Sequence, residues 1–109
     1  MINPGSFLRA ATGSLRIYGH SMFPKYPAGC IVAFKDADLE VIIWGEDYVI
    51  ELEDRRIIKR LEKGRTDQTV TAVSYNKSDT YIYDPIEIPI RKIKRLFMVL
   101  GKIELEASI

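Results

Sequence analysis

"YVIELEDRRIIKRLEKG", residues 48–64, is the stretch that decides the fold, because it holds two strand-like runs joined by a short polar segment. Residues 54–56 separate the two runs, and Gly64 follows the second. This arrangement predicts a β-hairpin.

Short segments with the same period of two residues occur on both sides of this hairpin, and turn-forming residues bound them. No window of a dozen residues has a helical period. Residues 75–85, "YNKSDTYIYDP", are rich in turn formers and are expected to be a loop. The chain is therefore predicted to be mostly β, with strands at 15–20, 31–35, 41–44, 48–53, 57–62, 69–74, 93–99 and 102–105.

The length and composition fit a single domain. The chain has 109 residues, 47% of them hydrophobic, which allows one modest core. Residues 1–14 contain Pro4, Gly5 and Gly13 and are expected to be a lead-in segment with at most a short helix at 8–11. Residues 15–109 are expected to form the domain.

Charge, cysteine content and the length of the apolar runs argue against nucleic-acid-binding, disulfide-bonded and membrane-spanning proteins. With 16 basic and 15 acidic residues, the net charge of +1 gives no reason to expect nucleic-acid binding, and the basic run at 91–95 is interpreted as a solvated strand end. One cysteine cannot form an internal disulfide, so a reducing cytoplasm is the expected compartment. The longest apolar runs have five residues, far fewer than the roughly 20 of a membrane span, and no signal peptide is recognisable.

"YGHSMFPKYPAGC", residues 18–30, holds the first candidates for chemistry. In a strand, His20 and Ser21 would point to opposite faces, and the chain has no second histidine, so a Ser-His-Asp site is not expected. One histidine and one cysteine ten residues apart make no metal site, and no cofactor is predicted. Cys30 opens an apolar run and is expected to pack as a small hydrophobic residue.

Lys59 offers a different base for Ser21. With a period of two, it shares a face with Ile57 and Leu61, where burial would lower its pKa from about 10.4 by up to 3–5 units. The alternative is that its amine extends into water along these side chains and that Ser21 is a turn residue. A serine needs a base, so the pair favours a nucleophilic serine.

These motifs resemble the LexA and UmuD type of self-cleaving repressor and mutagenesis proteins, whose domains use a Ser-Lys dyad. The resemblance covers about residues 17–103. It rests on "GHSM", Pro24, "AGCIVAF", "WGEDYVIELE", "IIKRLEKG", "VSYNKS" and "LFMVLGKI", in this order.

The resemblance implies that Ser21 is the nucleophile and Lys59 the general base, and that Met22 packs beside the site. The backbone amides of His20 and Ser21 are the candidates for the oxyanion hole. It further implies a compact LexA/signal-peptidase-like domain of short twisted sheets and hairpins, which forms a homodimer through its C-terminal strands. A RecA filament and operator DNA are implied partners, by resemblance only, and neither a membrane nor a small-molecule ligand is expected.

Two departures from the family keep alternatives open. Cys30 replaces a turn aspartate, and no Ala-Gly dipeptide precedes Ser21, since Ala28-Gly29 lies downstream in a predicted turn. A helix-turn-helix domain is also absent, so the chain is interpreted as an excised domain, a cleavage product or a stand-alone relative. The alternative functions are a non-catalytic dimerisation module of a phage-type repressor and, less favoured, a signal-peptidase-like enzyme.

Overall fold

The computed structural model describes residues 9–77 and 82–104, and in this part of the chain β-strands dominate. The strands are β1 (Gly13–Arg16), β2 (Ile31–Asp36), β3 (Asp47–Glu51), β4 (Arg56–Lys63), β5 (Thr69–Val73), β6 (Ile86–Pro89) and β7 (Arg95–Ile103). A short 3-10 helix, η1 (Ile90–Lys92), lies between β6 and β7. The prediction of a mostly β domain is confirmed.

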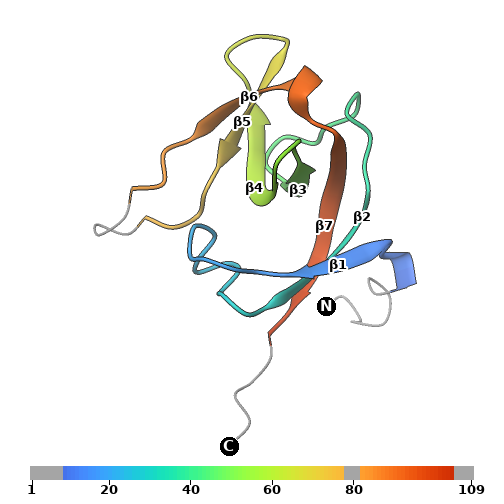
Figure 1. The fold of residues 1–109 in the computed structure, drawn as a ribbon, viewed down its shortest axis with the longest axis vertical. Coiled ribbons are helices and arrows are strands. Elements are labelled where there is room, and N and C mark those ends of the chain that lie inside the picture. Colours follow the sequence, from blue (N-terminus) through green and yellow to red (C-terminus); the bar gives the residue numbers. More distant parts are fainter. Residues whose placement is uncertain (1–8, 78–81, 105–109) are drawn as a thin grey trace, which may run out of the picture.

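All seven described strands belong to one antiparallel sheet. Their order is β1-β2-β7-β3-β4-β5-β6, so β7 lies between β2 and β3 in the centre of the sheet. The predicted hairpin is present as β3 and β4, and the amide of Leu52 donates to the carbonyl of Arg55 at 2.8 Å across its turn. Figure 1 shows the sheet curling around its interior like a partly closed barrel.

Two of the predicted strands are wrong or too long, because the chain turns where apolar residues suggested extension. Residues 41–44 form no strand: Val41 and Trp44 are exposed, and Gly45 turns the chain at φ +90° just before β3. The strand predicted at 15–20 ends at Arg16, because the next amide, that of Ile17, bonds to Cys30 and closes a loop.

Three other strands differ from the prediction. β6 was not predicted. β7 is one continuous strand where two were predicted, and it contains a β-bulge at Leu100, so that Val99 and Gly101 pair with consecutive residues of β2. β1 begins at Gly13, inside the expected lead-in. Residues 9 and 10 are helical, whereas residues 1–8 and 105 lie outside the described part.

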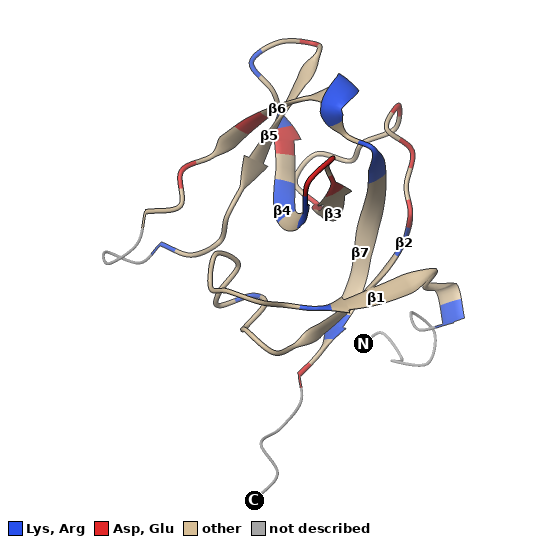
Figure 2. Ribbon diagram, in the orientation of Figure 1, with Lys and Arg blue, Asp and Glu red and all other residues tan. Residues whose placement is uncertain are grey.

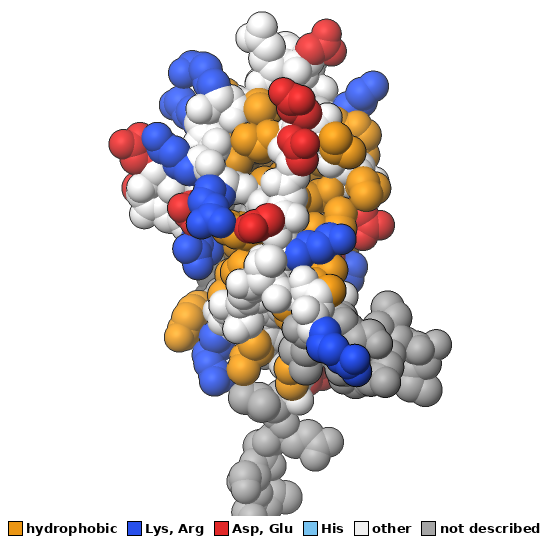
Figure 3. Space-filling view, turned by 90° about the vertical axis from the view of Figure 1, so that its right-hand side faces the viewer, with side chains coloured by type: hydrophobic (Ala, Val, Ile, Leu, Met, Phe, Trp, Pro, Cys, Tyr) orange, Lys and Arg blue, Asp and Glu red, His pale blue; other side chains and the backbone are white. Residues whose placement is uncertain are grey.

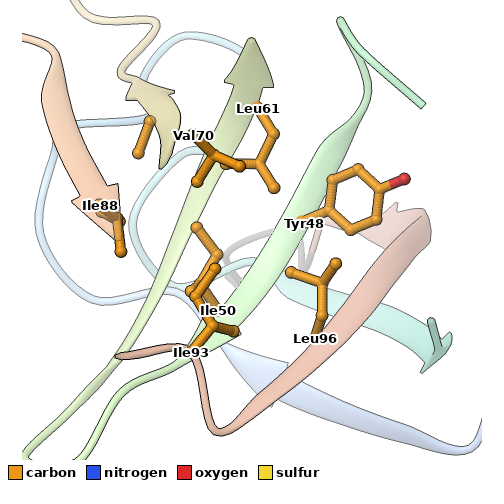
Figure 4. Close-up of a cluster of buried hydrophobic side chains, with 8 residues drawn as sticks. Tyr48, Ile50, Leu61, Val70, Ile88, Ile93 and Leu96 are labelled. Carbon is orange, nitrogen blue, oxygen red and sulfur yellow. The ribbon is translucent and has the colours of Figure 1, made fainter. Parts of the chain in front are cut away.

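The largest hydrophobic cluster fills the space between β3, β4, β5, β6 and β7. Figure 4 shows its side chains pointing toward one another from these elements. Its buried members are Tyr48, Ile50, Leu61, Val70, Ala72, Ile88, Ile93 and Leu96. A second cluster lies between β2 and the loop that follows β1, and it consists of Ile17, Met22, Tyr26, Cys30 and Val32. Cys30 is thus buried as expected.

Charged residues are spread over the surface without one dominant sign. Figure 2 shows basic residues on η1 and at the start of β7, and acidic ones elsewhere along the same sheet. The charged side chains of the basic segment 91–95 are exposed as expected, but residues 91 and 92 belong to η1 rather than to a strand end, and Ile93 is buried. Arg95 pairs with Asp36 at 3.2 Å. Figure 3 shows acidic, basic and apolar side chains interspersed on the face that carries β2. No helix in the described residues is long and apolar enough to cross a membrane.

Replacing Leu61 by alanine should destabilise the domain by about 2–5 kcal/mol, because this fully buried side chain belongs to the largest cluster. Urea unfolding followed by circular dichroism measures the change. Lys63→Ala, at an exposed position of the same strand, is the control and should change stability by no more than about 0.5 kcal/mol. Equal effects of the two substitutions would contradict this description of the core.

Candidate active site

Ser21 lies in a closed loop, residues 17–30, that connects β1 and β2. The base of the loop is closed by two backbone hydrogen bonds, from Ile17 N to Cys30 O at 2.8 Å and from Gly29 N to Ile17 O at 2.9 Å. Met22, which is 1% exposed, anchors the loop in the second hydrophobic cluster. The burial of this neighbouring side chain keeps Ser21 close to the core.

The segment after β5 holds the same loop from the other side. The backbone amide of Asn76 donates to the carbonyl of Ser21 at 2.9 Å, and its side-chain amide donates to the carbonyl of His20 at 2.8 Å. These bonds tie two consecutive peptide groups of the loop to one residue. The backbone at Ser21 is therefore fixed by contacts 55 and 56 residues away in sequence.

Lys59 approaches Ser21 from β4. In the β3–β4 ladder it lies opposite Tyr48, and its side chain is only 8% exposed. The Nζ atom donates to the Oγ atom of Ser21 at 2.7 Å. The structure thus brings together the two residues that strand periodicity and motif order singled out.

Burial lowers the pKa of Lys59 below its ordinary value, and the positive charge of Arg55 lowers it further. Within the described residues no carboxylate forms an ion pair with this amine. The neutral form of the amine is therefore favoured more than in a solvated lysine. A neutral amine can accept the proton of the hydroxyl that it contacts.

A cavity of about 320 Å³ opens beside this pair. It is lined by residues 15–18, which run from β1 into the loop, by residues 56–59 of β4, and by Ser21. β5 pairs only with residues 60–63 of β4, so the first half of β4 has an edge without a strand partner in the described residues. Two extended segments thus border a space next to the Ser21 hydroxyl.

The amides of His20 and Ser21 donate no hydrogen bond within the described part of the chain. Ser21 is half-buried at the wall of the cavity, whereas His20 is not among the residues that line it. The assignment of these two amides to an oxyanion hole stays a prediction.

His20 is placed differently from the prediction. It belongs to a bend and not to a strand, so alternation of strand faces is the wrong reason for separating it from Ser21. Its side chain is exposed, and the hydroxyl of Ser21 bonds to Lys59 instead.

Sequence reasoning missed the buried carboxylate of Asp47, which contacts Tyr26, Tyr75 and Lys25 near the site. The only signal was an acidic residue directly before the predicted strand at 48–53, where turn residues are common. The described residues contain no group of three histidine, cysteine, aspartate or glutamate side chains that could hold a metal ion.

A family model described as Peptidase S24-like matches residues 3–105, nearly the whole chain. The chain belongs to the Peptidase S24-like family. This is the LexA and UmuD type of Ser-Lys peptidase that the sequence motifs resemble. No curated protein matches the chain. In this S24 peptidase-like domain, the paired serine and lysine are the residues that the resemblance indicated.

Replacing Lys59 by methionine should stabilise the domain at pH 7, because the protonated amine is costly to bury and methionine is not. The pKa of Lys59 is lower in the folded state than the roughly 10.4 of an unfolded lysine, so the unfolded state binds more protons between these values. The cost is complete below the folded pKa and disappears as pH approaches about 10. Melting curves should show a gain of a few degrees at pH 7 and a smaller gain near pH 10.

Lys63→Met on the exposed end of β4 is the matched control and should show no such dependence on pH. An equal gain for Lys59→Met at both pH values would show that the folded and unfolded pKa values are the same.

Proposed function

We propose that this domain is a serine peptidase that cleaves its own chain with Ser21 as nucleophile and Lys59 as general base. The observation that carries the proposal is the 2.7 Å hydrogen bond between the Ser21 Oγ and Lys59 Nζ atoms, made by an amine that is buried and has a lowered pKa. Membership in the S24 peptidase-like family supports it.

In the first half of the reaction, Ser21 Oγ attacks the carbonyl carbon of the scissile peptide bond while its proton moves to Lys59 Nζ. The negative charge that develops on the carbonyl oxygen is accepted by the backbone amides of His20 and Ser21. The Lys59 ammonium then gives its proton to the departing amine. The peptide bond breaks, and an ester between Ser21 and the acyl fragment remains.

In the second half, a water molecule takes the place of the departed amine. Lys59 removes a proton from this water, and the resulting hydroxide attacks the ester carbon. The ammonium returns the proton to Ser21 Oγ as the ester bond breaks. The products are a carboxylate fragment and an amine fragment, and the dyad is restored.

The cavity supports an extended peptide as the substrate class. Residues 15–18 and 56–59 border it on two sides, and a segment laid between them would pass directly over Ser21. Unpaired backbone groups along the first half of β4 can bind such a segment as an added strand. This geometry suits a loop of the same chain or of a second copy.

The regulatory role rests on the family resemblance. A transcriptional repressor or a mutagenesis protein would lose or change its activity on cleavage, with a RecA filament as the stimulus and operator DNA as the target of a DNA-binding domain. The second candidate is a dimerisation module of a phage-type repressor that has the same dyad but does not cleave.

Ser21→Ala and Lys59→Ala should each reduce self-cleavage of the full-length protein by about 10⁴-fold or more, because each removes one half of the reacting pair. Fragments are counted by intact-protein mass spectrometry after incubation between pH 7 and pH 10, with and without an activated RecA filament. In the wild type, cleavage should become faster as pH rises through the lowered pKa of Lys59, since only the neutral amine accepts a proton.

Lys59→Arg is the control that keeps the positive charge but stays protonated, and it should be as inactive as Lys59→Ala. Cleavage at the wild-type rate in any of these variants would refute the dyad. A wild-type protein that gives no fragments under all these conditions would favour the module that only dimerises.

The expected homodimer has some support from β7. β3 covers β7 only over residues 95–98, so beyond Met98 one edge of β7 faces no strand in the described residues. Sedimentation equilibrium at micromolar concentrations should give twice the chain mass. A single-chain mass at all concentrations would contradict the dimer without bearing on the dyad.

A further inference from the structure

A buried carboxylate lies beneath the loop that carries Ser21. Asp47 begins β3 and is 4% exposed, yet it is ionisable and lies among aromatic side chains. Its Oδ2 atom accepts a hydrogen bond from the hydroxyl of Tyr26 and forms an ion pair with Lys25 Nζ at 2.7 Å. Its Oδ1 atom accepts a hydrogen bond from the hydroxyl of Tyr75 at 2.5 Å. Both oxygens are thus satisfied, as a buried charge requires.

The two phenols come from the two segments that fix Ser21. Tyr26 lies within the 17–30 loop. Its amide donates at 2.9 Å to the carbonyl of Met22, the residue that follows Ser21. Tyr75 directly precedes Asn76, which holds the carbonyls of His20 and Ser21. Asp47 therefore joins the loop and the segment that clamps it.

The third connection leads to the base. Asp47 is followed by Tyr48, which lies opposite Lys59 in the β3–β4 ladder. A displacement of Asp47 relative to the loop would therefore also displace Ser21 relative to the strand pair that carries Lys59. The cluster thus links the loop that carries Ser21 to β3, the strand that pairs with the strand carrying Lys59.

Cations lie over the two phenol rings of this cluster, and one of them, Lys25, also pairs with the Asp47 carboxylate. Lys25 lies 5.0 Å from the centre of the Tyr75 ring, the guanidinium of Arg60 lies 5.3 Å from the same ring, and Lys102 lies 5.9 Å from the ring of Tyr26. Burial and the neighbouring Asp47 raise the pKa of both phenols, so they stay protonated and keep donating in alkaline solution. The connections hold throughout the pH range in which the lysine would work.

We propose that Asp47 is a positioning residue, which through Tyr26 and Tyr75 holds the Ser21 hydroxyl against the Lys59 amine. The inference rests on the proposed peptidase function. Asp47 itself touches neither of the two reacting groups and acts through the loop. Its place in the fold, rather than any contact with substrate, gives it this role.

Asp47→Asn tests the inference, because it preserves shape but turns one acceptor oxygen into a donor and removes the ion pair with Lys25. The loop should loosen, and phosphonylation of Ser21 by a fluorophosphonate probe should slow by about 10- to 100-fold. Loosening also lets water reach Lys59, so the midpoint of the rate against pH should move upward. Intact-protein mass spectrometry measures the phosphonylation.

Glu87→Gln is the matched control. Glu87 on β6 also accepts several hydrogen bonds, from Thr69 Oγ1 at 2.6 Å, Thr71 Oγ1 at 2.7 Å and the amide of Arg65 at 2.6 Å, but it does not contact the loop. Its loss should lower the melting temperature without moving the midpoint of the pH profile. The same upward movement in both variants would overturn the inference, since it would show a general effect of lost stability.

A second readout separates this inference from the peptidase function. The 13Cε chemical shift of Lys59, assigned with Lys59→Arg, reports its titration whether or not the protein cleaves anything. Asp47→Asn should raise the pKa of this amine, and Tyr75→Phe, which deletes one hydroxyl only, should raise it less. An unchanged titration in both variants would refute the positioning role, whereas an inert Ser21 in the wild type would refute the peptidase alone.

Discussion

The burial of the Lys59 amine is the constraint on which the rest of this structure depends. An amine that is largely buried, with no carboxylate paired to it in the described residues, is costly to protonate, and its contact with Ser21 replaces part of the lost hydration. β-Sheet geometry supplies the burial, because Lys59 projects from the same face of β4 as Leu61, which is completely buried. The chemistry proposed for the domain thus begins as a property of its core.

The curl of the sheet explains how two distant segments meet. Three strands separate β1 from β4 in the sheet order, yet residues 15–18 and 56–59 line the same cavity. A flat sheet would hold them about 19 Å apart, since neighbouring strands lie about 4.8 Å from one another. The partly closed form of the sheet therefore creates the site (Figure 1). The short pairing of β4 with β5, restricted to residues 60–63, leaves room for it.

Sequence periodicity predicted those features that depend on alternation along a single strand. The shared face of Ile57, Lys59 and Leu61 follows from a period of two and needs no tertiary information. The boundaries at Arg16 and Gly45 could not be predicted in this way, because hydrogen bonds to distant residues decide where the chain turns: Ile17 bonds to Cys30, and Gly45 bonds to Leu61. The contact of Ser21 with Lys59 was found only by combining the strand pattern with the order of the family motifs.

The contacts of buried Asp47 could not be predicted from strand periodicity, and they show which interactions hold the 17–30 loop in place. Residues 17–30 lack the ladder of hydrogen bonds that fixes a strand, so their position depends on a few specific ties. A hydrophobic anchor such as Met22 holds the loop against the core but leaves it free to slide, since apolar packing has little directional preference. Hydrogen bonds to Asp47 and Asn76 do fix the orientation of the loop. The contact between Ser21 Oγ and Lys59 Nζ at 2.7 Å depends on this orientation more than on further burial. Polar contacts therefore position Ser21 relative to Lys59, whereas apolar packing stabilises the sheet.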